Sequence, residues 1–421
     1  MGSLMRFLKD FYQNKGLLVF LSILVEKVVG LINTIFVVRL ISTEDYGLIT
    51  LIAALFGVFI TFNGLGSVQG LLRYGALAKD VDAKQKLSQY IFKHGLKRHL
   101  VLLLVFIIVA LFYELKYESI WMIIGFFGLR MFGYYIYSFV LNYYRVLNRN
   151  DYFAKISMII NGIGLVMAIA LTYGLGTYGY LLGLALTPWL ALIFIPRTFL
   201  QHIPKIIPHL DTQAFWKFSF NSSATYFLSE LLFMLDVFLI GLLLNEAAVA
   251  QYKVAIILPM NLMFIPMIFM QTDYPKLVEN SNNRDYLHFY IRNYYKLFIP
   301  LVSAMLFIGY WIKDWIVSFV FGSAYIQQGS IFYIILIAIA FNMCFRNLYG
   351  NLLSAVGLAH LNSRVAALSL LMMSILGYYL ISVFAIRGAA IALAITFITM
   401  GMYSAYLFYS YLNHLPKNED N

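Results

Sequence analysis

The sequence predicts an all-α polytopic membrane protein with about twelve transmembrane helices in two parallel six-helix repeats. Three observations predict this class. First, the chain is 62% hydrophobic and only 12% charged, whereas about 25% of the residues in a soluble domain are charged. Second, apolar runs recur along the whole chain, near the length of about 20 residues that a helix needs to cross a bilayer. Third, the second half of the sequence repeats the first.

The repeat consists of three weak matches at nearly one shift. The segment YRVLNRNDYFAK leads from one apolar run into the next, and LSAVGLAHLNSR does the same 209 residues later, from 144 to 353. The matched pairs are Tyr144–Lys155 with Leu353–Arg364, Tyr178–Leu186 with Arg387–Ala394 and, more loosely, Ser42–Gly47 with Asn245–Tyr252. Several matches at one shift indicate an internal duplication. Two like halves are a common architecture for transporters, with the substrate site between them.

The apolar runs place six spans in each half. The first six are expected near 15–40, 47–72, 87–113, 119–146, 152–173 and 177–198. The second six are expected near 214–243, 247–272, 290–312, 327–355, 363–384 and 388–411. Six is an even number, so both repeats share one orientation in the membrane. We expect an N-lobe at 1–200, a cytoplasmic linker at 201–213 and a C-lobe at 214–421, with a central cavity between the lobes.

Orientation follows from the basic residues. With both termini in the cytoplasm, most of the 30 Lys and Arg residues fall on the cytoplasmic side. Only Arg39, Lys116, Lys313 and Arg387 fall on the other side. This distribution follows the positive-inside rule and accounts for most of the net charge of +11. The positive charge therefore indicates the lipid bilayer as the partner and no nucleic acid.

Chemical signatures of enzymes and cofactor proteins are missing from the sequence. The single cysteine, Cys344, falls inside an expected span, which excludes disulfides and cysteine-based metal sites. All seven histidines are expected in cytoplasmic loops or at cytoplasmic span ends, and no HExxH or nucleotide-binding loop occurs. We therefore expect no enzyme, no catalytic residue, no metal and no cofactor. The energy for transport would come from an ion gradient, the membrane potential or a substrate gradient.

Polar residues inside spans 1, 4, 7 and 10 are the candidate site. Mid-membrane charges are costly and commonly line a cavity or a transport pathway. The alternative is a structural ion pair that fixes helix packing, and both interpretations stay open for each charge. The candidate ion-coupling carboxylates are Glu26, Asp236 and Glu230. Helix breakers mark span 2 and span 8 as gating regions or as ordinary kinks; they are Asn63, Gly64 and Gly66, and Pro259 and Pro266.

Four segments carry a family resemblance. The chain resembles the polysaccharide-transport branch of the multidrug/oligosaccharidyl-lipid/polysaccharide exporter superfamily, which includes the Wzx-type O-antigen flippases. The segments are Val38–Gly47 (VRLISTEDYG), Gly64–Arg73 (GLGSVQGLLR), Leu235–Tyr252 (LDVFLIGLLLNEAAVAQY) and Phe319–Tyr325 (FVFGSAY). The resemblance covers nearly the whole chain, although each motif is degenerate.

The resemblance implies a function. Such flippases move undecaprenyl-diphosphate-linked oligosaccharides across the bacterial inner membrane by alternating access between two six-helix bundles. It implies that three basic residues attract the diphosphate and anionic sugars: Lys27, Arg130 and Arg346. It implies that four amides bond sugar hydroxyls: Asn33, Asn63, Asn142 and Asn342. Tyr134 and Tyr137 would stack on sugar rings. A polymerase and chain-length proteins of a polysaccharide pathway are the implied protein partners.

Three other classes compete with the flippase. A multidrug cation antiporter of the same superfamily needs an acidic cavity, which Glu26 and Asp236 permit but the neighbouring basic residues oppose. A major-facilitator transporter usually carries a GxxxDRxGRR-like run between spans 2 and 3, and RYGALAKDVDAKQK does not match it. An O-antigen polymerase usually has a long periplasmic loop with arginines, which this chain lacks. The flippase is therefore the expected function, and the antiporter is the alternative.

Overall fold

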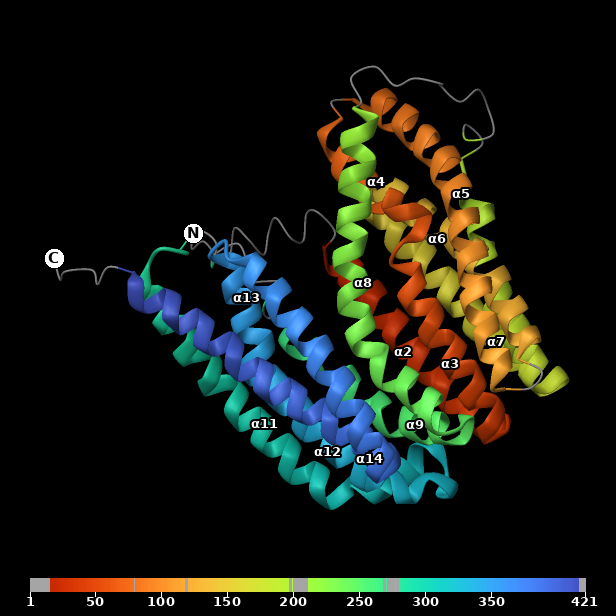
Figure 1. Ribbon diagram of the computed structural model, residues 1–421. Helices are drawn as coiled ribbons and strands as arrows, with labels where there is room; N and C mark the ends of the chain where they lie inside the picture. Colours follow the sequence, from red (N-terminus) through yellow and green to blue (C-terminus); the bar gives the residue numbers. More distant parts are fainter. Residues whose placement is uncertain are drawn as a thin grey trace. The chain divides into compact units, whose positions relative to one another are not determined.

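The computed structural model describes residues 16–78, 80–117, 120–196, 199, 211–267, 270, 277 and 280–415. Within these residues all regular structure is helical and no strand occurs (Figure 1). The expected all-α class is therefore confirmed.

The chain divides into two compact units, residues 1–230 (unit 1) and 231–421 (unit 2). The division falls inside one helix, α8 (Thr212–Leu243), which bends by 46° between Leu228 and Glu230. The first half of α8 belongs to unit 1 because its Phe215 ring packs 5.2 Å from the ring of Tyr74. Residues 201–210 of the expected linker lie outside the described residues. The lobe boundaries expected from the sequence stay a prediction.

In its described residues, unit 1 is built from six α-helices and the first half of α8, joined by short 3-10 segments. Its elements are α2 (Gly16–Leu40), α3 (Thr43–Ile60), η1 (Asn63–Gly66), α4 (Ser67–Leu77), α5 (Val81–Leu111), η2 (Phe112–Leu115), α6 (Trp121–Val146), α7 (Asn150–Leu186) and η3 (Thr187–Phe194). Ser42 caps α3 through its hydroxyl, which accepts from the Asp45 N–H, and Asp80 caps α5 in the same way. These caps satisfy N–H groups that a helix start leaves free.

Unit 2 holds the second half of α8 and the remaining helices. Its elements are α9 (Glu246–Leu262), α11 (Arg284–Phe321), η5 (Ser323–Gln328), α12 (Gly329–Phe341), the π-helix η6 (Asn342–Asn347), α13 (Leu348–Ala355) and α14 (Ala359–His414). Pro259 lies inside α9, which ends at Leu262. The expected interruption of span 8 is thus a helix end between the two prolines.

Helix lengths agree with twelve spans. Eight described stretches are long and apolar enough to cross a membrane, and the bent pair in α8 gives a ninth. Two of the eight are double: Asn150–Phe194 has 45 residues and His360–His414 has 55. At about 1.5 Å per residue each far exceeds a hydrocarbon core of about 30 Å. Each contains a sharp break, at Gly176 (φ 60°, ψ −139°) and at Ala385 (φ 51°, ψ −135°). The 25-residue apolar helix α2 completes twelve.

Backbone geometry confirms the repeat residue by residue. The Arg149 N–H donates to the Tyr144 carbonyl at 2.8 Å, and 209 positions later the Leu358 N–H donates to the Leu353 carbonyl, also at 2.8 Å. In the next repeated turn, a Cβ at Gly179 would meet the Leu171 carbonyl, and a Cβ at Gly388 would meet the Leu380 carbonyl. Positive φ angles also recur at the shift of 209 positions. Asn148 is matched by Gly357, and Gly176 is matched by Ala385. The duplication is therefore structural as well as sequential.

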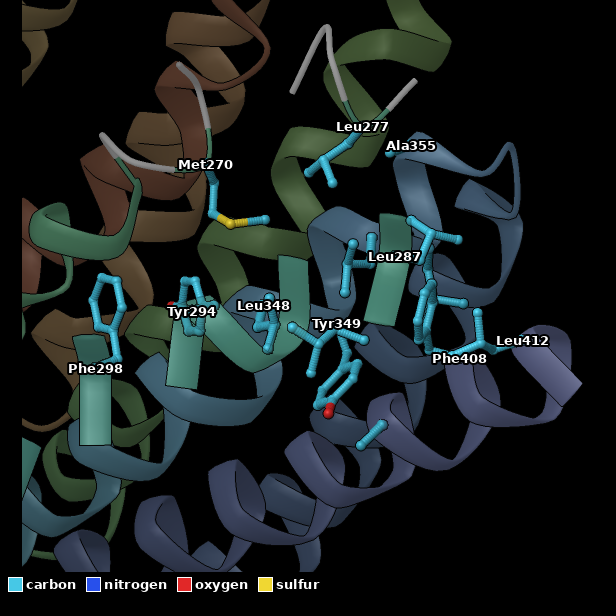
Figure 2. Close-up of a cluster of buried hydrophobic side chains, with 14 residues drawn as sticks. Met270, Leu277, Leu287, Tyr294, Phe298, Leu348, Tyr349, Ala355, Phe408 and Leu412 are labelled. Carbon is cyan, nitrogen blue, oxygen red and sulfur yellow. The ribbon is translucent and has the colours of Figure 1, made fainter. Parts of the chain in front are cut away.

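A hydrophobic core with buried aromatic rings holds each unit together. In unit 2 the core joins α11, α13 and α14, and Tyr349 and Phe408 are wholly buried in it (Figure 2). In unit 1 the core joins α4, α5 and α6 with the start of α8 through Phe139 and Phe215. These cores exclude water from each helix bundle, so the polar groups inside must find partners within the protein.

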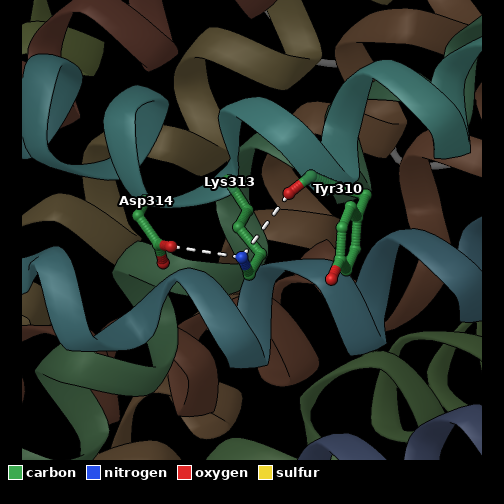
Figure 3. Close-up of polar contacts among 3 residues, drawn as sticks. All are labelled: Tyr310, Lys313 and Asp314. Atoms are coloured by element: carbon green, nitrogen blue, oxygen red, sulfur yellow. Dashed lines mark hydrogen bonds and ion pairs between the residues drawn. The ribbon is translucent and has the colours of Figure 1, made fainter.

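One end of α11 shows the expected interfacial chemistry. Trp311 and Trp315 are exposed there, as Trp121 is at the start of α6. Between the two tryptophans of α11, Lys313 Nζ lies 3.1 Å from a carboxylate oxygen of Asp314 and 5.0 Å from the centre of the Tyr310 ring (Figure 3). Aromatic rings beside charged groups are typical of the membrane–water interface. The side of the membrane on which this end lies stays a prediction.

Candidate functional site

Arg130 is the centre of a polar niche inside unit 1. It lies on α6, where its guanidinium donates to the Leu184 carbonyl of α7 at 2.6 Å. The hydroxyl-bearing rings of Tyr134, Tyr137 and Tyr180 are close enough to interact with it electrostatically. On the α3 side its guanidinium carbon lies 5.4 Å from the centre of the Phe56 ring. Residues of three helices thus surround one half-buried cation.

Among the described residues, no carboxylate forms an ion pair with this cation. In the part of the chain that the structure describes, Arg130 forms no ion pair, and its one hydrogen bond is to a carbonyl. A guanidinium has five N–H donors in a planar fork that matches phosphate and carboxylate groups. Because an uncompensated charge in an apolar interior is costly, a charge kept there indicates an anionic ligand or a polar pathway.

The niche continues into a network of amides and hydroxyls. Asn33 of α2 donates to the Tyr180 hydroxyl at 3.2 Å, which joins α2 to α7. Asn161 donates to the Tyr137 hydroxyl at 3.2 Å, and the Tyr137 hydroxyl also lies 3.3 Å from the Ser157 hydroxyl. The Asn33 side-chain oxygen is buried and has no hydrogen-bond partner within the described part of the chain. The network therefore retains hydrogen-bonding capacity for a ligand.

Two carboxylates approach the niche beside Tyr134. Glu26 of α2 and Glu230 of α8 both interact electrostatically with this tyrosine. A Cβ built at Gly57 would lie 3.4 Å from a Glu230 carboxylate oxygen, so this glycine makes room for the acid. The Tyr134 ring also packs against Phe56, with ring centres 5.8 Å apart. The structure thus gathers six predicted residues: Asn33, Arg130, Tyr134, Tyr137, Glu26 and Glu230.

Three predicted residues of unit 1 lie apart from this contact network. Asn142 uses its amide on the Ser138 carbonyl of its own helix at 2.8 Å. Twelve residues separate it from Arg130, or about 18 Å along the helix. Lys27 is exposed beside Glu26. Asn63 is buried in the break of span 2, and neither polar atom of its amide has a hydrogen-bond partner among the residues that the structure describes. Two unpaired buried polar atoms indicate a bound water or ligand there.

The break in span 2 is confirmed, and it has a partner that the sequence did not predict. Gly64 and Leu65 adopt left-handed backbone angles between α3 and α4. The wholly buried His99 of α5 accepts the Gly64 N–H at its Nδ1, at 3.3 Å. Its Nε2 then carries the hydrogen and donates to the Met131 carbonyl of α6 at 2.9 Å. His99 directly precedes the apolar run that begins at Leu100, as expected for a span end, and its ring is wholly buried inside the bundle.

In unit 2, Asp236 is wholly buried and fully engaged. Its two carboxylate oxygens accept from the Tyr252 hydroxyl at 2.7 Å and from the Val237 N–H at 2.8 Å. Lys253 lies close enough to interact with it electrostatically. A carboxylate with such partners is held in one place and responds to the charge of its surroundings.

Arg346 lies in a π-helical turn with different partners. Its guanidinium donates to the Asn362 side-chain oxygen at 3.3 Å, and Asn362 in turn donates to the Gly350 carbonyl at 2.7 Å. The same π-helix contains the buried Asn342. Single π-turns inside α-helices are frequent at functional sites. The carbonyl of Met343 in this turn accepts from the Tyr294 hydroxyl at 2.8 Å.

Sequence reasoning missed several residues of these sites, among them Tyr180, His99 and Asn362. Tyr180 and Asn362 carry no charge, so they do not stand out in apolar spans. His99 falls at the boundary between a basic segment and an apolar run, where a span end is the ordinary interpretation. The one available signal for Tyr180 is its place in the repeated YGYLLGLAL segment.

Comparison with known proteins supplies the family. Residues 13–281 match the family described as "Polysaccharide biosynthesis protein". The chain belongs to this family. A comparison with curated proteins found no match.

Solved structures show the same fold. The lipid II flippase MurJ in an inward closed conformation is 15% identical, covers 96% of this chain and 94% of its own, and has a TM-score of 0.69. An inward-facing multidrug resistance MATE transporter of the MOP superfamily is 14% identical over 94% and 96%, with a TM-score of 0.65. The Vibrio cholerae MATE transporter VcmN is 15% identical over 99% of both chains, with a TM-score of 0.63. The protein is thus a polytopic membrane protein of the polysaccharide biosynthesis family, with the fold that these transporters share.

Proposed function

We propose that this protein is a flippase for undecaprenyl-diphosphate-linked oligosaccharides, such as O-antigen or another surface polysaccharide repeat unit. It would act in the bacterial inner membrane by alternating access. The carrying observation is Arg130, a half-buried guanidinium in unit 1 with no carboxylate partner in the described residues. The family and the fold, which MurJ shares, support the same class.

The niche around Arg130 suits a phosphorylated sugar. A guanidinium can donate two parallel hydrogen bonds to a phosphate, and such charge-assisted bonds are among the strongest in proteins. The hydroxyls of Tyr134 and Tyr137 and the amide of Asn33 would bond sugar hydroxyls. Arg346, Asn342 and the unpaired Asn63 would contribute further contacts during the cycle.

The carboxylates would couple transport to an ion or proton gradient. Asp236 is the foremost candidate for an ion- or proton-responsive group because it is wholly buried in unit 2 with a fixed set of partners. Glu26 and Glu230 would adjust the charge of the niche beside Tyr134. A polymerase and chain-length proteins would receive the translocated product.

The decisive experiment removes the cation from the niche. Arg130→Ala should lower flipping of a fluorescent undecaprenyl-diphosphate oligosaccharide in proteoliposomes by about 10- to 100-fold, the range for losing one or two charge-assisted hydrogen bonds. Arg130→Lys should restore part of the rate because a lysine keeps the charge without the planar fork. The exposed Arg387→Ala is the matched control and should transport at the original rate. Normal flipping by Arg130→Ala would remove the assigned role.

The alternative is a multidrug or cation antiporter of the same superfamily. The two acids beside Tyr134 favour it, since a cationic substrate needs carboxylates. The same proteoliposomes separate the two functions. Uptake of a lipophilic cation that is lost in Glu26→Gln and Glu230→Gln but retained in Arg130→Ala would support the antiporter over the flippase.

A further inference from the structure

One face of α5 changes its chemistry abruptly along its length. Its first half exposes three lysines, Lys86, Lys93 and Lys97. The same face continues with Val101 (57% exposed), Leu104 (61%) and Ile108 (59%). The spacing of these six residues follows the helical period of three and four. The opposite face is buried against the rest of unit 1.

The apolar half of this face marks the hydrocarbon region. It is entirely aliphatic or aromatic from Leu100 to Phe112 on its exposed positions, which suits lipid tails rather than a water-filled pathway. Since the first exposed apolar residues are Leu100 and Val101, the boundary of the hydrocarbon lies just before them. Figure 1 shows α5 as one continuous orange helix across this boundary.

Helix geometry then sets the depth of each lysine. Lys97 lies four residues before Val101, or about 6 Å along the axis, and Lys93 lies about 12 Å away. The polar layer of a leaflet is about 5–7 Å thick. Lys97 therefore lies in the headgroup layer, and Lys93 lies within reach at its outer edge. Lys86, about 22 Å from the boundary, stands in water.

The lysines also differ in their partners. Lys86 is neutralised by Asp82 at 2.6 Å, one turn away. In the described part of the chain, Lys93 and Lys97 form no ion pair. The adjacent Arg98 is already committed to the protein, with its guanidinium 3.6 Å from the centre of the Trp216 ring. On the exposed face of α5, Lys93 and Lys97 are thus two charges at headgroup depth without an ion pair among the described residues.

We propose that Lys93 and Lys97 form a docking surface for the phosphate headgroups of anionic phospholipids, in the leaflet at which α5 begins. The two residues are four positions apart and point the same way, so two ammonium groups can contact one or two neighbouring headgroups. This surface goes beyond the proposed transport function and does not depend on it. The surface would hold unit 1 at a fixed depth in the membrane through α5, the longest unbroken helix that the structure describes in this unit.

Lipid retention tests the proposal. The purified protein in detergent is mixed with phosphatidylglycerol or phosphatidylcholine, and bound lipid is counted by native mass spectrometry. The original protein should retain more phosphatidylglycerol than phosphatidylcholine. The double variant Lys93→Gln, Lys97→Gln should weaken the retention of phosphatidylglycerol about 20- to 30-fold. Each basic residue at an anionic surface contributes about fivefold in affinity, and the double variant loses two of them. Lys93→Arg with Lys97→Arg should restore it. Lys86→Gln is the matched control and should change nothing.

Three results would overturn the proposal. The first is equal retention of the two lipids by the original protein. The second is an equal loss of phosphatidylglycerol in Lys86→Gln, which would indicate a diffuse charge effect. The third is retention of undecaprenyl diphosphate without phosphatidylglycerol, which would make the lysines a substrate contact. An unchanged melting temperature in phosphatidylcholine shows that the variants are folded.

Discussion

Ala385 occupies a backbone conformation that glycine adopts far more easily. Its angles (φ 51°, ψ −135°) nearly equal those of Gly176 (φ 60°, ψ −139°), the residue 209 positions earlier in the repeat. Both residues form the sharp turn between two successive spans. A side chain at such angles costs about 1–3 kcal/mol. The second repeat thus carries strain that the first avoids.

This pair gives a prediction about stability. Ala385→Gly should raise the melting temperature in detergent because it relieves the strained turn. Gly176→Ala should lower it, although a Cβ there meets open space, because only the backbone is strained. The helical Gly162→Ala, where a Cβ also meets open space, is the control and should be neutral or stabilising. A lower melting temperature for Ala385→Gly would contradict the account.

The two candidate arginines show how far residue-level reasoning reached. Both were predicted from charge inside matching spans. At the shift of 209 residues, however, Arg346 corresponds to Tyr137 and Arg130 corresponds to Ile339. The two arginines therefore stand two helical turns apart in the repeat, or about 10 Å. Their different partners, a carbonyl for Arg130 and an amide for Arg346, follow from this offset.

At the scale of elements, the break in span 2 is held by a histidine. Three residues in a row, Gly64, Leu65 and Gly66, have positive φ. His99 satisfies one N–H that the break leaves free and ties the break to α6 through Met131. Helix breakers predicted the break itself from the sequence. Its partner could not be predicted, because a hydrogen bond between residues 35 positions apart depends on how α5 packs.

Substitution of His99 should separate its hydrogen bonds from its volume. His99→Gln keeps a donor and an acceptor in a similar space and should retain most of the stability. His99→Leu should be less stable by about 1–3 kcal/mol, because it leaves the Gly64 N–H unpaired in a buried position. Melting temperatures of the two variants in one detergent provide the comparison. Equal stability of both variants would show that the hydrogen bonds do not hold the break.

At the scale of the whole molecule, the two units are similar in backbone and differ in which charged residues they hold at matching positions. The caps Ser42 and Asn245 accept from the N–H groups of Asp45 and Ala248, which aligns the turns that follow spans 1 and 7 at a shift of 203 positions. In that register Asp236 corresponds to Asn33. Unit 2 thus has a buried acid where unit 1 has an amide, and unit 1 has Arg130 where unit 2 has Ile339. This asymmetry supports a division of labour, with anion binding in unit 1 and ion response in unit 2.

The division of labour predicts different outcomes for two acid-to-amide changes. Asp236→Asn should weaken the dependence of flipping on an imposed ion or proton gradient by tenfold or more. Glu26→Gln should reduce it less, because Glu26 is exposed rather than held by partners. Tyr252→Phe removes one hydrogen bond from Asp236 and should give an intermediate effect. Flipping rates in vesicles with and without a gradient measure this, and unchanged dependence in Asp236→Asn would defeat the coupling role.

The sequence by itself determined the class of the protein, the twelve spans and the duplication. These follow from apolar length and from local turn chemistry, which act over a few residues and are therefore visible in the chain. It also named six residues of the niche around Arg130, because charges and tyrosines stand out in apolar spans. Only the tertiary structure decided which of these residues meet, that Asn142 turns to its own helix, and that Tyr180, His99 and Asn362 complete the sites. Such contacts join residues far apart in the chain, so packing alone brings them together.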